Sequence, residues 1–275
     1  YEPKVGYYFS KDPFGKNGDF ITSPVISNLF SEIVGIWLVS TWEKIGKPKI
    51  FNFVELGPGD GSLTKVIIST LKKFPELNKA IKIYLYEKSV FLKKLQKQNI
   101  DNKRIKWIKN FSSIKKGPVI FFGNEFFDAI PIKQFSNINN ELFEKYYSVK
   151  NKINIIEKFI KSDEKDMTQI KKFETLKKLK FIEFPKKGFL ELNPIIKKIN
   201  KLSGGILLID YGYLNENNSN TIQAVMDNKK ISTEIMLKNL GKADITSLVN
   251  FNLLKEYFLK NKLKVKKIVT QRFFL

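Results

Sequence analysis

Apolar residues follow two different spacings along the first half of the chain. Residues 50–56 and 81–87 are short apolar runs, whereas 62–74 and 89–99 place apolar residues three and four positions apart. Short apolar runs are typical of buried strands, and the longer spacing is typical of helices with one buried face. A further strand is expected at 104–108. Strands that alternate with helices in this way predict a parallel sheet with right-handed crossovers.

Weaker patterns surround this region. Before it, the chain is expected to be irregular over 1–24 and helical over 26–38. After it, the continuous apolar run 118–123 is typical of a strand at the centre of a sheet. Three more elements are expected: a strand at 204–210, a helix at about 246–260 with Asp244 as its cap, and an edge strand at 263–269.

Residues 133–193 differ in character from the rest. Strand-like pieces at 142–149 and 153–159 are followed by a charged helical stretch at 164–180. We interpret the region as an insertion over the edge of the sheet, although a lysine-rich, solvated subdomain without a role in a site would have the same pattern. The chain is therefore divided into an N-terminal lid segment and helix (1–49), a ligand-binding core (50–132), an inserted substrate-side subdomain (133–193) and the remainder of the core (194–275).

A glycine-rich turn joins the strand at 50–56 to the helix at 62–74. Its sequence is Glu55-Leu-Gly57-Pro58-Gly59-Asp-Gly61. Glycine lets the backbone adopt positive φ and approach a ligand closely, and the first turn of the helix adds free N–H groups. Such a turn is typical of a nucleotide-like ligand.

The spacing of the turn excludes two kinds of nucleotide loop. A dinucleotide fingerprint would need glycine where Ser62 stands, and a P-loop would need lysine directly after Gly61. Glu55 would repel a phosphate, but it suits a ligand that has an ammonium group and no phosphate. S-adenosylmethionine is such a ligand.

A second acid follows the next predicted strand. Glu87 ends the run 80–87, and an acid at the tip of this strand can accept hydrogen bonds from both ribose hydroxyls. Glu87 is therefore a candidate ribose anchor. A solvated acid at a strand end, or a cap for the helix beginning near Ser89, would look the same in sequence.

Composition excludes several kinds of chemistry. The 275 residues are 43% hydrophobic and include 24 phenylalanines, which is enough for a substantial core. The chain has no cysteine and no histidine, so thiol catalysis, zinc–thiolate sites and serine–histidine triads are excluded, and no metal site is expected. No apolar stretch reaches the roughly 18 residues of a membrane helix, and no signal peptide opens the chain.

The net charge of +22 comes mostly from lysine. Only Arg104 and Arg272 are arginine, and the lysines are scattered rather than gathered into one stripe with aromatic residues. We interpret the charge as a solvated surface shaped by biased composition, so nucleic-acid binding is disfavoured. A basic surface would still favour acidic partners or anionic membranes.

Together these stretches resemble the MidA-like class I methyltransferases, the family of the mitochondrial protein arginine methyltransferase that acts as a complex I assembly factor. The resemblance spans nearly the whole chain, and the motifs occur in the family's order. The matching stretches are 6–8, 14–15, 18–24, 54–61, 86–89, 124–131, 209–212, 244–246, Gln271 and 274–275. The implied fold is an α/β, Rossmann-like methyltransferase with a mostly parallel central sheet, an N-terminal segment over the cofactor and an inserted α+β subdomain.

The chain departs from the family pattern in three respects. Val25 stands where the family usually has glutamate, and Asn228 or a neighbour stands where it usually has histidine. The chain is also expected to be truncated at both ends. The lost glutamate and the missing ends leave open a non-catalytic protein that retains the fold.

The resemblance implies S-adenosylmethionine as cofactor and assigns roles to the motif residues. We expect Glu55 and the backbone of the turn (Gly57, Pro58, Gly59 and Gly61) to hold the methionine portion, Glu87 the ribose, and Asn124 to lie near the sulfonium. Gly18, Asp19 and Thr22 are candidate cofactor contacts in a segment that closes over the site. That segment could instead form turns and pack on the sheet edge.

The acceptor is expected to be an arginine of a protein, and carboxylates would orient its guanidinium. Glu125 and Asp128 are the candidate catalytic acids together with Asn124, and they would share one face if the segment were helical. Capping and dipole compensation are the alternative roles of these acids. Tyr7, Tyr8, Asp210 and Tyr211 are candidate substrate contacts.

Three functions remain open from the sequence. The first is methyl transfer to an arginine of a protein, such as a subunit of respiratory complex I. The second is an RNA methyltransferase, which would need a contiguous basic groove at the cofactor mouth. The third is an assembly or scaffold protein without activity. The expected compartment is the bacterial cytoplasm, or the mitochondrial matrix in a eukaryote.

Overall fold

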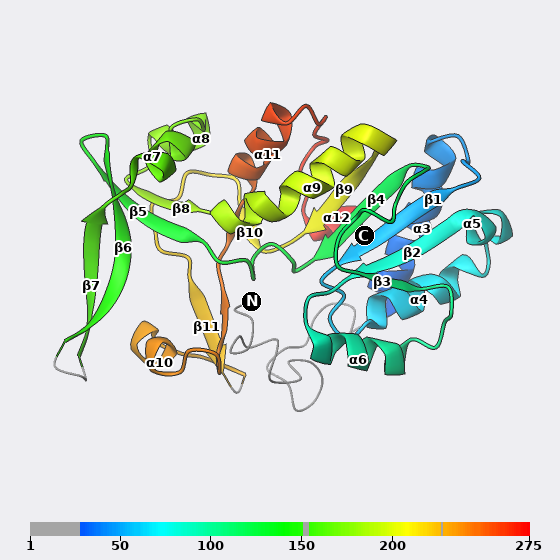
Figure 1. Ribbon diagram of the computed structural model, residues 1–275, viewed down its shortest axis with the longest axis horizontal. Helices are drawn as coiled ribbons and strands as arrows, with labels where there is room; N and C mark the ends of the chain where they lie inside the picture. Colours follow the sequence, from blue (N-terminus) through cyan, green and yellow to red (C-terminus); the bar gives the residue numbers. More distant parts are fainter. Residues whose placement is uncertain (1–27, 151–153, 227) are drawn as a thin grey trace.

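A five-stranded parallel sheet forms one half of the molecule (Figure 1). The computed structural model describes residues 28–150, 154–226 and 228–275. The strand order is β3-β2-β1-β4-β9, and every neighbouring pair is parallel. The strands are β1 (Phe51–Leu56), β2 (Ile81–Tyr86), β3 (Lys106–Ile108), β4 (Val119–Asn124) and β9 (Gly204–Ile209). The predicted parallel sheet is confirmed.

Helices cover both faces of this sheet. Phe51 and Phe53 of β1 pack with α3 (Asn28–Lys44) and α4 (Ser62–Leu71). Val54 and Leu56 lie in the opposite cluster, with α9 (Lys186–Leu202) and α11 (Phe251–Lys260). Because alternate side chains of a strand point to opposite faces, a continuous apolar strand fills both layers. The short helices α5 (Pro75–Ala80) and α6 (Val90–Asn99) complete the parallel half. No helix in the described ranges is long and apolar enough to cross a membrane.

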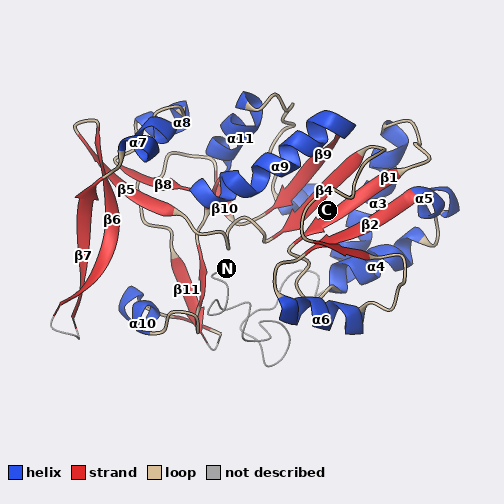
Figure 2. Ribbon diagram, viewed as in Figure 1, coloured by secondary structure: helices blue, strands red, loops and turns tan. Residues whose placement is uncertain are grey.

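A second, antiparallel sheet forms the other half (Figure 2). Its strand order is β7-β6-β5-β8. The helices α7 (Glu164–Ile170) and α8 (Glu174–Lys177) stand between β7 and β8 in the sequence. The strands are β5 (Lys133–Ile138), β6 (Glu141–Lys150), β7 (Asn154–Lys161) and β8 (Phe181–Phe184). The strand pieces and the charged helical stretch expected within the insertion are therefore present. The boundary expected at 193/194 falls inside α9, whose buried residues continue at helical spacing from Phe189 to Ile199.

The chain after β9 does not simply complete the parallel sheet. It forms a two-stranded pair of β10 (Gly212–Tyr213) with β14 (Val249–Asn250) and a small sheet in the order β12-β11-β13. The remaining elements are β11 (Gln223–Met226), β12 (Lys229–Lys230), α10 (Thr233–Lys238), β13 (Asp244–Thr246) and α12 (Gln271–Phe274). The role of Asp244 as a helix cap was predicted wrongly, because Asp244 lies in β13. Asn250 caps α11 instead, with its Oδ1 accepting from the Leu253 N–H at 3.0 Å.

The edge strand expected at 263–269 is also absent from the described structure, where this segment has no regular backbone. Leu263 and Val265 are partly buried against the core cluster that contains α9 and α11. The alternation in sequence therefore reflects packing of every second side chain, without the backbone pairing that would make a strand.

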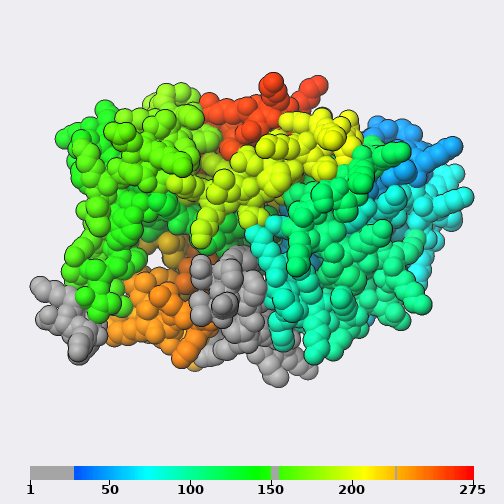
Figure 3. Space-filling view, in the orientation of Figure 1, coloured from blue at the N-terminus to red at the C-terminus, as the bar shows by residue number. Residues whose placement is uncertain are grey.

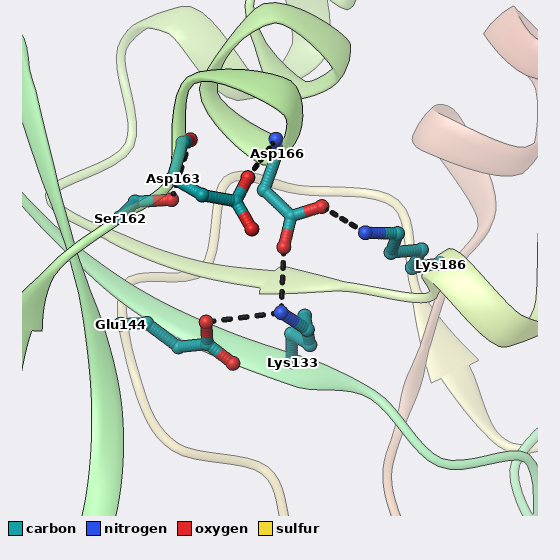
Figure 4. Close-up of polar contacts among 6 residues, drawn as sticks. All are labelled: Lys133, Glu144, Ser162, Asp163, Asp166 and Lys186. Carbon is teal, nitrogen blue, oxygen red and sulfur yellow. Dashed lines mark hydrogen bonds and ion pairs between the residues drawn. The ribbon is translucent and has the colours of Figure 1, made fainter.

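A buried ion cluster connects the antiparallel sheet to α9 (Figure 4). The Asp166 side chain is fully buried, and its two carboxylate oxygens accept from Lys133 at 2.6 Å and from Lys186. Lys133 also contacts Glu144 at 2.9 Å. Burial opposes ionisation of Asp166, but the two lysines outweigh it and hold its pKa below the ordinary value. Lys186 is the first residue of α9, so the cluster fixes where this helix begins.

Replacing Asp166 with alanine is expected to lower the free energy of unfolding by about 2–4 kcal/mol, because two lysines lose a buried partner. Urea unfolding at neutral pH measures the change. Glu141→Ala removes an exposed ion pair of the same sheet, with Lys161 at 2.7 Å, and should cost less than about 1 kcal/mol. If both variants lower the free energy of unfolding by the same amount, the buried cluster stabilises the fold no more than an exposed ion pair does.

Candidate active site

The glycine turn has the backbone conformation that its sequence predicts. Gly57, Gly59 and Gly61 have φ angles of 62°, 55° and 85°, in the region that side chains other than glycine rarely adopt. A Cβ on Gly61 would lie 2.6 Å from Cδ1 of Ile100. The Gly57 N–H donates to the carbonyl of Tyr86 at 3.0 Å, so the turn is fixed to the end of β2.

Glu55 lies behind this turn. It shares the face of β1 that carries Phe51 and Phe53, and its buried carboxylate accepts from the Thr64 hydroxyl at the start of α4. Burial, opposed by Thr64, raises the pKa of Glu55 to about 7. The structure therefore does not bring Glu55 to the cavity described below, because strand alternation directs it toward α4. Direct contact with an ammonium group stays a prediction.

Glu87 and the glycine turn are joined by a buried glutamine. The Oε1 atom of Glu87 accepts from the Ser89 N–H at 2.7 Å, and Oε2 accepts from Gln96 at 3.3 Å. Gln96 also donates to the Gly59 carbonyl at 2.8 Å and accepts from the Trp107 ring N–H at 2.9 Å. Glu87 thus supports the start of α6, as its alternative interpretation supposes, and the same bonds fix its position relative to the turn.

A cavity opens beside the turn at the carboxyl ends of β1 and β2. It has about 740 Å³ of empty space, part of it open to solvent, and Gly57 and Glu87 both line it. The other lining residues are Tyr86, Lys88, Phe126, Ile130, Pro131, Lys187 and Glu191. In parallel α/β sheets, ligands bind at this end of the strands. A glycine turn and a strand-end acid on one cavity are compatible with the expected S-adenosylmethionine site, in which Glu87 would hold the ribose and the turn the methionine portion.

Acidic side chains gather where β4 and β9 end. Asp210 follows β9, and its Oδ2 accepts from the N–H groups of Phe127 at 2.8 Å and Asp128 at 3.2 Å. Asp128 is buried, and Glu125 has a φ of 49°. The segment that holds Glu125 and Asp128 is a turn, so the condition under which the two acids would share a helix face is not met. Asp210 orders the turn and brings the acids of two strands together.

The neighbouring acids of this cluster, together with burial, raise the pKa values of Asp128 and Asp210. Burial, followed by the charges of Asp210, Asp244 and Glu125, raises the pKa of Asp128 far above its ordinary range. Burial also raises the pKa of Asp210, although three backbone N–H groups oppose the shift. No group of acids in the described ranges has the arrangement of a metal site. A cation bound beside these acids would lower the cost of ionising them.

The other expected site residues lie in different settings. Asn124 ends β4 and donates to Glu125 at 3.2 Å, next to the acidic cluster. Tyr211 is 61% exposed beside Asp210, and the charge of Glu125 followed by burial raises its pKa. Five expected contacts, namely Tyr7, Tyr8, Gly18, Asp19 and Thr22, lie outside the described residues, as does Val25.

Sequence reasoning did not identify Gln96, Lys187 and Glu191 as site residues. Gln96 is fully buried although it stands in a lysine-rich helical segment, and the one local signal is its position four residues after Leu92 and four before Ile100, both buried. Glu191 accepts from the Tyr86 hydroxyl at 3.0 Å and pairs with Lys88 at 2.5 Å, across more than a hundred residues. Such long-range contacts leave no local signal.

Known structures share this fold. A Burkholderia thailandensis protein whose crystal structure contains S-adenosyl-homocysteine matches with a TM-score of 0.76, over 95% of this chain and 69% of that one. A native structure from the same organism matches with a TM-score of 0.73, over 95% and 68%. Sequence identity is 17% in both cases, so the likeness concerns the fold.

Curated relatives match along most of the chain. The mitochondrial protein arginine methyltransferase NDUFAF7 homologue of Caenorhabditis elegans is 31% identical over 92% of this chain and 64% of its own length. NDUFAF7 of Homo sapiens is 28% identical over 92% and 62%. The chain thus spans less than two thirds of the length of these relatives. The model of a family of S-adenosyl-L-methionine-dependent methyltransferases matches residues 33–269, and the chain belongs to this family.

Proposed function

We propose that the protein transfers a methyl group from S-adenosylmethionine to an arginine of a protein substrate. The cofactor part of the proposal is supported by family membership and by the cavity that Gly57 and Glu87 share. We assign the ribose to Glu87 and the methionine portion to the backbone of the glycine turn, with Asn124 beside the sulfonium. A subunit of respiratory complex I is the substrate that the family resemblance implies.

The acids at the ends of β4 and β9 carry the acceptor part of the proposal. Asp128 resists ionisation because it is buried next to Asp210, and partial burial with the charge of Glu125 also raises the pKa of Asp210. A guanidinium is always protonated and can bind carboxylates through two hydrogen bonds at once. Its charge would let both acids ionise, so an arginine side chain fits this cluster better than a neutral nucleophile does.

The mechanism needs positioning more than proton transfer. The cofactor would supply an electrophilic methyl group by in-line displacement: the N–C bond would form as the S–C bond breaks, S-adenosyl-homocysteine would leave, and the nitrogen would lose a proton to a neighbouring carboxylate. Glu125 and Asp128 orient the guanidinium and localise its charge, so that one nitrogen becomes the better nucleophile. Asp210 holds the turn that carries both acids through its bonds to Phe127 and Asp128. The absence of histidine is therefore no obstacle.

Gly59→Val is expected to weaken S-adenosylmethionine binding by about 100-fold or more, because a branched side chain at positive φ distorts the turn and fills space next to the cofactor. Titration calorimetry measures the loss. Gly46→Val is the matched control: Gly46 has a φ of 90°, with nothing within 4 Å of an added Cβ, and it precedes β1 at the opposite end of the strand. Equal binding by wild type and Gly59→Val would contradict the proposed cofactor site.

The acceptor is tested separately. Methyl-labelled cofactor is incubated with native cell extract and the protein, and the modified residue is mapped by mass spectrometry. Label on arginine of a protein supports the proposal. Label on RNA alone would identify an RNA methyltransferase, and cofactor binding without any transfer would favour a scaffold role.

A further inference from the structure

Two lysines line the cofactor cavity, and they differ in their contacts. Lys88 pairs with Glu191 at 2.5 Å, so its charge already has a partner. Lys187 lines the same cavity and makes no ion pair with any residue in the described ranges. An unpaired cation on a ligand cavity is a candidate contact for an anionic part of the ligand.

The position of Lys187 along α9 follows from its neighbours. Glu191, four residues further along α9, reaches the end of β2 through Tyr86 and Lys88. Gly188 lies against the turn after β4, where an added Cβ would be 2.5 Å from the Phe127 ring. Residues four apart share a helix face and are separated by roughly 6 Å along the axis. Lys187 therefore lies one helical turn before Glu191, on the side of α9 nearer to the loop that follows β4.

Figure 3 shows where α9 lies on one face of the molecule. The atoms of α9, in yellow, lie between the green atoms of the antiparallel half and the cyan and teal atoms of the parallel half. The ion cluster at Asp166 holds the first residue of α9, and Glu191 holds its next turns to β2. Lys187 is thus carried by a helix segment that is fixed at both ends.

We propose that Lys187 binds the carboxylate of the methionine portion of S-adenosylmethionine. The inference rests on the proposed function, which puts the ribose at Glu87 and the sulfonium near Asn124. The methionine end then points away from β2, toward the side of the cavity where Lys187 lies. Glu87 and Glu191 also line this cavity, so an entering carboxylate needs a cationic partner. Lys187 is a binding residue in this assignment and takes no part in the displacement.

The test compares two cofactors that differ only in this carboxylate. Titration calorimetry is performed with S-adenosylmethionine and with its decarboxylated form, on wild type and on Lys187→Gln. Loss of one charge-assisted bond should weaken S-adenosylmethionine binding by about 10- to 100-fold. Decarboxylated cofactor should bind wild type and the variant with the same Kd within about three-fold, because it never makes the bond.

Two further variants separate this role from a general effect of charge. Lys187→Arg keeps the cation and should restore most of the affinity. Lys197→Gln removes an exposed lysine of the same helix away from the cavity and should have no effect. Unchanged S-adenosylmethionine binding by Lys187→Gln, or equal losses for both cofactors, would overturn the assignment while leaving the proposed function intact. Failure of wild type to bind S-adenosylmethionine would overturn both.

Discussion

Asp128→Asn is expected to slow methyl transfer by about 10²- to 10⁴-fold while changing the Kd for S-adenosylmethionine by less than about three-fold. The amide keeps the shape of the carboxylate but loses the charge that orients the guanidinium. Asp128 does not line the cavity beside Gly57 and Glu87, so cofactor binding should be spared. Single-turnover transfer to the protein acceptor gives the rate, and calorimetry gives the affinity.

The control for this prediction is Asp101→Asn, which removes one carboxylate at an exposed position. It should leave both the rate and the affinity unchanged. Undiminished transfer by Asp128→Asn would exclude Asp128 from the catalytic acids. An equal loss of cofactor affinity would show instead that the acidic cluster supports the cofactor side of the site.

The parts of the fold that were predictable have local sequence signals. The turn from Glu55 to Gly61 combines an apolar strand, glycines that need positive φ, and a helix with regular spacing. Each of these features is encoded within a few residues, so strand, turn and helix were recognised together. The parallel sheet follows, because strands that alternate with helices can be connected in few ways.

The parts that were missed depend on tertiary contacts. Gln96 joins Gly59 to Glu87, and its place on the buried face of α6 does not indicate these bonds. Asp244 preceded a helical pattern, but backbone pairing with Val225 makes it part of a strand. In both cases a contact with a residue distant in sequence decides the outcome, so the local pattern does not indicate it.

The stability of the free protein is expected to fall as pH rises from about 5 to 8, and Asp128→Asn should reduce this fall. Burial raises the pKa values of Glu55, Asp128 and Asp210 above their ordinary values of 4.5, 3.8 and 3.8. In this range the folded protein therefore keeps protons that the unfolded chain has already lost, so stability decreases with pH. The slope is at most about 1.4 kcal/mol per pH unit for each carboxyl.

Urea unfolding at pH 5, 6, 7 and 8 measures the slope for wild type, Asp128→Asn and the control Asp101→Asn. Asp166 and Glu256 have lowered pKa values, so they titrate mostly below this range and contribute little to the slope. A slope equal to that of wild type in Asp128→Asn would contradict the role assigned to burial of Asp128. The predicted slope also bears on the acceptor: an arginine bound at the cluster would favour the ionised acids, so it should stabilise the protein more at pH 8 than at pH 5.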